Sequence, residues 1–286
     1  MKKKLSLVLE GGGMRGAYTA GCLSWLLDQG IEFDYAYGIS TGAIHLTSYL
    51  MKNKDFLYET STNYIADKSV IGITPLLKER TIASYNHLFN DVLKKKLGYD
   101  IADIKDKTKC KAKYGVYDLD KSETVYIPIK EMNNEILKAC TSLPIIGKVV
   151  VDNNRKFLDG GITKMIPIEE AVNDGCTHHL IITTKPFDYV RKPAKDVVVK
   201  IMGIVYKTCP KIASDYKERH INYNKQIAII KDLEKTGNAL YRYPTKTIDV
   251  SRLRGDKEDL RALYELGRND MEASKEEIYK LIKWRS

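Results

Sequence analysis

The segment GISTG, residues 38–42, places a serine between two glycines directly after a short apolar run. G-x-S-x-G at a strand-to-helix turn is a nucleophile elbow, in which the turn projects the serine hydroxyl above a sheet. The N-terminus of the following helix then favours developing negative charge near that hydroxyl. Gly38 and Gly42 are expected where a Cβ would collide with neighbouring backbone. The pattern predicts Ser40 as a nucleophile.

The segment LSLVLEGGGMRGAYTAG, residues 5–21, has two interpretations. It matches G-x-G-x-x-G, the phosphate-binding turn of a dinucleotide-binding unit, after an apolar run. Such a unit needs an acidic residue at the end of its second strand. Asp34 stands near the start of that predicted strand, and GISTG occupies its end. The nicotinamide-dependent oxidoreductase is therefore the weaker interpretation.

The same loop suits a site built around Ser40. Loops that follow neighbouring parallel strands emerge at one edge of the sheet. We therefore expect the backbone N–H groups of Gly11, Gly12 and Gly13 to point at Ser40, where they would stabilise a tetrahedral oxyanion. Arg15 is expected to orient this loop or to meet a substrate phosphate.

The segment LDGG, residues 158–161, holds a carboxylate on a tight turn directly after a predicted strand. An Asp-Gly turn is common and alone carries no chemistry. Beside the elbow and the glycine loop, it favours Asp159 as a base for Ser40, with Gly160 as the turn residue. Because the ordinary pKa of aspartate lies near 4, partial burial would be needed to make it a better base.

The periodicity of the chain predicts the elements that position these residues. An apolar run, a helix, a second strand and a second helix follow one another, which implies parallel strands joined by a right-handed crossover. Beyond Pro186 the pattern changes to long helices with one strand-like segment, KTIDVS. Strands are expected at residues 5–9, 33–37, 112–118, 124–128, 149–151, 156–158, 179–184 and 246–251, and helices at 15–28, 43–51, 131–140, 168–173, 209–235, 257–266 and 274–284.

GGGMRG (11–16), GISTG (38–42) and LDGG (158–161) resemble, in type, order and spacing, the three signature blocks of the patatin-like phospholipases. The resemblance covers roughly residues 5–185, and the helical tail is similar to that of small bacterial members. ACTSLPIIG (139–147) is similar to a further stretch of the family, with Cys140 and Thr141 where alanine and serine are more usual.

The resemblance implies a three-layer α/β/α core with a mainly parallel sheet and a C-terminal helical region. It implies a Ser40–Asp159 dyad and an oxyanion region formed by Gly11, Gly12, Gly13 and Arg15. It also implies cleavage of carboxylic esters of lipids through an acyl-serine intermediate. We expect a hydrolase core at residues 1–188 and a mainly helical region at 189–286. Acyl transfer to an alcohol other than water stays open, as do the lipid and the oligomeric state.

The composition and charge of the chain bear on its binding partners, cofactors and location. The chain has 286 residues and a net charge of +10, and residues 190–246 carry 13 Lys or Arg against five Asp or Glu. Such a bias favours contact with an anionic membrane surface, although a solvated helix face explains it equally well. Nothing resembles a nucleic-acid-binding motif. Five scattered cysteines predict neither disulfides nor a metal site, and no cofactor is expected. The basic N-terminal segment MKKKLSLVL is predicted to contain the first strand rather than a signal peptide. This prediction favours a cytoplasmic protein.

Two alternatives remain. An α/β-hydrolase with a Ser-Asp-His triad is permitted by chain order, since His178, His179 and His220 follow Asp159, whereas His45 is expected only to line the pocket. That fold, however, usually places several strands before its elbow. A degenerate regulatory scaffold is the second alternative, and the presence of all three motifs argues against it.

Overall fold

The computed structural model describes residues 3–66, 101–105 and 108–283. Its centre is an eight-stranded mixed sheet with the order β5-β6-β3-β2-β1-β7-β8, and β4 pairs with β3 outside this path. The parallel members are β1 (Leu5–Leu9), β2 (Tyr35–Ile39), β3 (Lys111–Asp118), β7 (His178–Ile182) and β8 (Ala239–Arg242). The antiparallel members are β4 (Glu123–Pro128), β5 (Val150–Asp152) and β6 (Arg155–Asp159). The mainly parallel sheet was expected.

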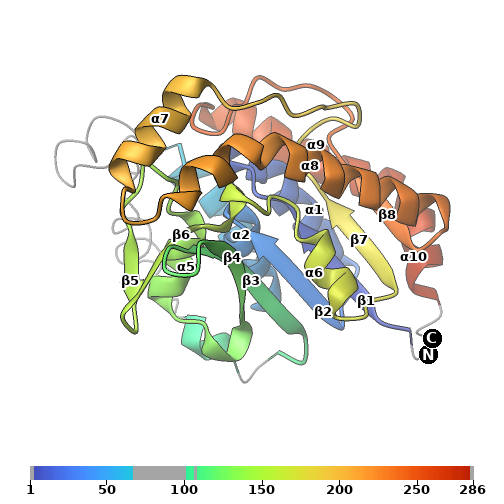
Figure 1. Ribbon diagram of the computed structural model, residues 1–286. Coiled ribbons are helices and arrows are strands. Elements are labelled where there is room, and N and C mark those ends of the chain that lie inside the picture. Colours follow the sequence, from blue (N-terminus) through green and yellow to red (C-terminus); the bar gives the residue numbers. More distant parts are fainter. Residues whose placement is uncertain (1–2, 67–100, 106–107, 284–286) are drawn as a thin grey trace.

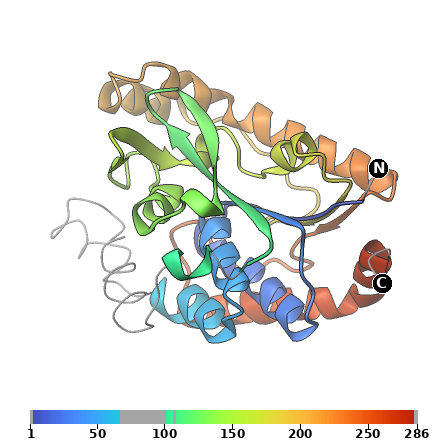
Figure 2. The same cartoon turned by 90° about the horizontal axis from the view of Figure 1, so that it is seen from below.

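Helices cover both faces of this sheet, which gives three layers (Figures 1 and 2). One face carries α6 (Ile168–Asn173) and the long α8 (Lys211–Lys235), which pack on Val8, Tyr37 and Ile181. The opposite face carries α1 (Gly16–Asp28), α2 (Thr41–Leu50), α3 (Lys54–Glu59), α5 (Asn134–Thr141), α9 (Lys257–Ala273) and α10 (Lys275–Ile282). The predicted α/β/α architecture is therefore confirmed.

Most predicted elements are present, with shifted ends. The second strand begins at Tyr35 rather than at residue 33, because Asp34 closes the preceding turn: its side chain accepts a hydrogen bond from Leu5 N–H at 2.8 Å. Part of the segment 52–108, for which the sequence pattern predicted no defined strand or helix, lies outside the described residues. The described remainder includes α3 and a short π-helical turn, Thr60–Tyr64.

One prediction for the C-terminal region is wrong, and two elements there were not predicted. KTIDVS forms no strand; the edge strand is instead β8, whose residues pair in parallel with β7. β8 was missed because four residues are too few to show a period-two pattern. The apolar segment VVVKIMGIV also forms a helix, α7 (Asp196–Val205), which the sequence pattern did not predict.

Helices α1 and α9 pack against each other through glycines. A Cβ added to Gly267 would lie 2.2 Å from the carbonyl oxygen of Tyr18, and one added to Gly21 would lie 1.9 Å from that of Tyr264. Contacts this short cannot occur, so both glycines set the separation of the two helices.

We predict that Gly267→Ala lowers the free energy of unfolding by about 2 kcal/mol, because forced separation of packed helices outweighs the gain of about 1 kcal/mol in helix propensity. Gly203→Ala in α7 is the matched control, since its Cβ would meet only Ala213 at 3.9 Å. Urea denaturation of both variants measures the difference. An unchanged stability for Gly267→Ala would show that the α1–α9 contact adjusts freely.

Candidate active site

Ser40 lies at the junction of β2 and α2 with strained backbone dihedral angles. It precedes α2 as its N-cap residue, with φ 55° and ψ −129°, and its side chain is almost fully buried. Positive φ is uncommon for residues other than glycine and is characteristic of functional turns. A Cβ on Gly38 would lie 2.7 Å from the carbonyl oxygen of Gly42, and one on Gly42 would lie 2.8 Å from those of Leu9 and Glu10. The turn therefore has the geometry of a nucleophile elbow.

Asp159 is brought to Ser40 by the antiparallel strand β6. It pairs with Val116 of β3 and is 2% exposed. One carboxylate oxygen, Oδ1, accepts a hydrogen bond from Gly161 N–H at 2.7 Å. The other, Oδ2, is buried with no hydrogen-bond partner in the described part of the chain. This oxygen is therefore open to receive a proton.

Burial raises the pKa of Asp159 above its ordinary value of 3.8, because a carboxylate loses hydration in the interior. The Ser40 hydroxyl, the Gly161 N–H and the positive charges of Arg219 and Arg252 act in the opposite direction. No hydrogen bond of ordinary geometry joins Ser40 to Asp159 here, and such contacts often tighten only when a substrate binds. The pKa of Asp159 is thus set by opposing effects of burial and charge.

The glycine loop packs directly against the elbow. A Cβ on Gly11 would lie 2.7 Å from the Cβ of Ser40, so a side chain there would displace the serine. Gly11 N–H donates to Met165 O and Gly12 N–H donates to the Thr41 hydroxyl, each at 3.1 Å. Gly13, at φ 61°, has no such acceptor among the described residues. Of the three expected oxyanion donors, its N–H is therefore the one available to a ligand.

Arg15 lies where the glycine loop enters α1. Burial lowers the pKa of its guanidinium, whereas the charge of Glu10 raises it. Its Nε is buried without a hydrogen-bond partner in the described structure. The other loop residue of note, Gly160, begins the turn after Asp159, and a Cβ there would lie 2.7 Å from the carbonyl oxygen of Gly115.

These residues surround one small cavity, which we call the elbow pocket. Its volume is about 20 Å³, enough for about one water molecule. An acyl ester is larger, so a bound ester would extend beyond this cavity or displace side chains that line it. The lining residues are Gly11, Gly12, Gly13, Arg15, Ile39, Ser40, Leu143, Asp159, Gly161, Met165, Arg191, Arg219 and Arg252.

A family model for patatin-like phospholipases matches residues 7–172, more than half of the chain. The chain belongs to the patatin-like phospholipase family. The matched segment contains the elbow, the glycine loop and Asp159. A second model, described as a domain of unknown function (DUF6363), matches residues 209–283.

One curated relative of this patatin-like chain is the uncharacterized protein YjjU of Escherichia coli (strain K12). The two are 25% identical over 187 residues, which cover 64% of this chain and 52% of YjjU. The aligned region therefore spans about half of that relative's length.

The histidines considered as triad members lie away from Ser40. His179 is paired with Ser6 near the start of β1, whereas Ser40 follows the end of the neighbouring β2. Its Nδ1 lies 2.8 Å from the Ser6 hydroxyl. His220, on α8, contacts Lys217 O through its Nδ1. None of these histidines lines the elbow pocket. This arrangement argues against a Ser-Asp-His triad.

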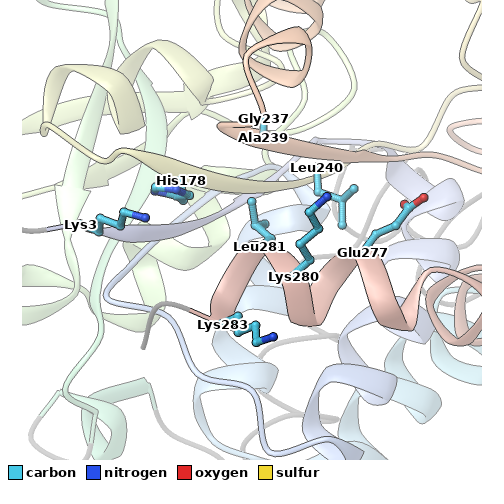
Figure 3. Close-up of a pocket in the computed structure, with 9 residues that line it drawn as sticks. All are labelled: Lys3, His178, Gly237, Ala239, Leu240, Glu277, Lys280, Leu281 and Lys283. Atoms are coloured by element: carbon cyan, nitrogen blue, oxygen red, sulfur yellow. The ribbon is translucent and has the colours of Figure 1, made fainter. Parts of the chain in front are cut away.

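His178 lines a larger cavity of about 510 Å³ between the sheet and α10 (Figure 3). The figure shows lysines around it, Lys3, Lys280 and Lys283, together with Glu277. Glu277 forms an ion pair with Arg242 at 2.8 Å. The residues that line this cavity include no serine, and Glu277 is the one carboxylate among them.

His45 is buried on α2 rather than in the elbow pocket. Burial lowers its pKa to about 4, so it is neutral at physiological pH. Its Nε2 lies 2.8 Å from the position of a Cβ on Gly16. It therefore packs beneath the glycine loop and contributes no charge to the site.

The charged residues of the elbow pocket that sequence reasoning missed are Arg191, Arg219 and Arg252. Arg191 and Arg219 lie within the basic segment 190–246, but such a bias does not identify individual side chains, and Arg252 lies outside that segment. Within the described ranges, no cluster of three or more His, Cys, Asp or Glu side chains is suited to hold a metal ion. Among the same residues, no helix has the length and apolar character needed to cross a bilayer.

The ionisation of Asp159 predicts the pH dependence of Ser40 reactivity. A general base must be unprotonated, so the rate of Ser40 labelling by a fluorophosphonate should rise about tenfold per pH unit below the pKa of Asp159. Because burial raises that pKa, the plateau is expected at a higher pH than for an ordinary aspartate. The measurement is the labelling rate across pH 3.5–8 with thermal stability monitored in parallel. A rate that is flat over this range would exclude Asp159 as the base.

Proposed function

We propose that this protein is an acyl hydrolase that cleaves carboxylic esters of lipids through a Ser40–Asp159 dyad. The observation that supports it best is the juxtaposition of the strained Ser40 with a buried Asp159 whose Oδ2 has no partner in the described structure. The two residues are 119 positions apart in the sequence, yet both line the elbow pocket. Membership of the patatin-like phospholipase family favours the same chemistry.

In the proposed reaction, Ser40 Oγ attacks the ester carbonyl carbon while its proton passes to Asp159 Oδ2. The oxyanion accepts a hydrogen bond from Gly13 N–H and lies near Arg15. Collapse of the tetrahedral intermediate breaks the bond to the alcohol, which leaves with the proton from Asp159. Water then attacks the acyl-serine, gives a proton to Asp159, and the fatty acid departs as Ser40 recovers that proton.

Ser40→Ala and Asp159→Asn should each lower kcat/KM for a p-nitrophenyl ester by about a thousandfold or more, as losses of this kind do in other serine hydrolases. Asp159→Asn should also raise the melting temperature at pH 7. Because the pKa of Asp159 is raised in the folded state, the stability that the protonated acid contributes is lost as pH rises through that pKa. An asparagine cannot ionise, so it avoids the cost of a buried carboxylate.

His220→Gln is the control for the triad alternative, since His220 lies outside the elbow pocket. Its activity should equal that of the wild type. A loss of activity in His220→Gln comparable to that in Asp159→Asn would contradict the dyad.

The exposed face of α7 supports delivery of the substrate from a lipid surface. Four apolar side chains at helical spacing, Val197, Ile201, Ile204 and Val205, are 38–75% exposed. Lysines flank them at positions 195, 200 and 207, which suits anionic headgroups. Ile145, also exposed, lies beside this helix because its N–H donates to the hydroxyl of Tyr206 at 2.9 Å. We propose that this apolar face inserts into the surface of an anionic membrane.

Val205→Asp should weaken binding to vesicles containing phosphatidylglycerol by at least about tenfold. The substitution removes an apolar side chain that would be buried in the membrane, and the negative charge of the aspartate is repelled by the anionic lipid. Val172→Asp on α6 is the matched control, since Val172 is 42% exposed and Val205 is 53% exposed. Vesicle sedimentation at low and high salt measures the effect. Equal binding by the two variants, or binding that is independent of salt and anionic lipid, would refute this surface.

A further inference from the structure

Three arginines from separate segments of the C-terminal region converge on the elbow pocket. Arg191 precedes α7, Arg219 lies on α8, and Arg252 lies between β8 and α9. Arg219 is 8% exposed, and its Nε is buried without a hydrogen-bond partner in the described structure. A fully buried guanidinium nitrogen without a partner is unfavourable. The unpaired Nε of Arg219 therefore indicates that this part of the pocket binds a ligand.

The described residues offset these charges only in part: Tyr216 and Asp159 raise the pKa of Arg219, while Tyr189 and Glu10 raise that of Arg191. No ion pair within 4.0 Å joins any of the three arginines to a described carboxylate. Arg219 stacks on Tyr216 at 5.3 Å and Arg191 on Tyr223 at 5.7 Å, which positions the guanidinium groups without cancelling their charge. Among the residues that line the pocket, Asp159 is the one carboxylate, against four arginines including Arg15.

The arginines also repel one another. Burial lowers the pKa of both Arg219 and Arg191; the charges of Arg252 and Arg191 lower that of Arg219 further, and the charge of Arg252 lowers that of Arg191 further. Gathering like charges in a buried site destabilises the folded chain unless an anion occupies it. Guanidinium groups bind phosphate with paired, charge-assisted hydrogen bonds, so several of them together favour phosphate over a neutral group.

The elbow pocket has an apolar part as well. Ile39, Leu143 and Met165 line it together with the arginines. An ester with a hydrocarbon acyl chain and a negatively charged alcohol part likewise has one apolar part and one charged part. The lining therefore matches both parts of such a molecule.

We propose that Arg191, Arg219 and Arg252 form a phosphate subsite that selects acyl esters whose alcohol part carries a phosphate group. The proposal rests on the proposed hydrolase function and specifies its substrate class. The subsite belongs to the C-terminal region, outside the segment that matches the phospholipase family model. Specificity would thus be supplied by a different part of the chain from the nucleophile.

The test compares three esters with the same decanoyl bond, chosen short to limit aggregation: 1-decanoylglycerol, its 3-phosphate, and its 3-phosphocholine. Wild-type kcat/KM is expected to be at least tenfold higher for the 3-phosphate than for decanoylglycerol. In Arg219→Gln and in Arg252→Gln that ratio should fall at least tenfold. The phosphocholine ester separates recognition of a phosphodiester from that of a phosphomonoester, and a preference for either supports the subsite.

Arg254→Gln is the matched control. Arg254 lies in the same loop as Arg252, pairs with Asp249 at 3.0 Å and does not line the elbow pocket. It should keep the wild-type ratio, and melting curves should confirm that all variants are folded. Two variants on different segments keep the test valid if one of them fails to fold.

Three results would overturn the subsite. Equal kcat/KM for the neutral and phosphate esters in the wild type would exclude phosphate selection. Equal losses on both esters in the arginine variants, with the pH profile moved to higher pH, would show that the arginines act only by lowering the pKa of Asp159. Competitive inhibition by inorganic phosphate without any preference among the esters would assign the site to a free anion rather than to a substrate.

Failure of the hydrolase proposal would give results that differ from those of a failed phosphate subsite. If no ester is cleaved and Ser40 is not labelled, but Arg219→Gln abolishes binding of inorganic phosphate in calorimetry, the anion site stands and the dyad does not. If Ser40-dependent cleavage of decanoylglycerol is intact without a phosphate preference, the hydrolase stands and the subsite does not.

Discussion

The backbone of Ser40 at φ 55° is the constraint around which the centre of the molecule is arranged. Residues other than glycine adopt such a conformation at a free-energy cost of order 1–3 kcal/mol, so the surroundings must hold it. They do so through close backbone contacts that only glycine permits, at Gly11, Gly38 and Gly42. The tight turn between β2 and α2 thereby determines how closely the first two parallel strands and their helices approach.

The proposed dyad also needs a carboxylate beside Ser40, and a change in strand direction places Asp159 there. β3 continues the parallel part of the sheet, whereas β6 runs antiparallel to it and ends at Asp159. Gly161 N–H holds one oxygen of Asp159, while burial makes the carboxyl a better proton acceptor by raising its pKa. The sheet is therefore the frame that brings together residues far apart in the chain.

The C-terminal region is joined to this frame rather than appended to it. β8 extends the sheet beside β7, and the glycine contact between Gly267 and Tyr18 fixes α9 on α1. From this position the region places Arg219 and Arg252 near Asp159, where their charges oppose the effect of burial on its pKa. The electrostatic field at the site is thus shared between the family core and the C-terminal region.

Much of the architecture was predictable because local patterns carry it. The apolar run before GGG, the helix after it and the GISTG junction indicate consecutive parallel strands, and LDGG indicates a carboxylate turn. Single residues were harder to place. β8 was too short for periodicity, and KTIDVS had the composition of a strand but no free sheet edge beside it, since β8 occupies the position next to β7.

The sequence by itself determined the elbow pattern and the Asp-Gly turn on which the proposed dyad rests, because a serine between glycines and an aspartate before glycines are local, steric requirements. Only the tertiary structure decided what surrounds them. Whether Gly12 N–H is free or bound to Thr41, and whether Arg219 meets solvent or the elbow pocket, depends on packing between segments distant in the chain. Charge and burial act through space rather than along the sequence, so the site's electrostatics became visible only after folding.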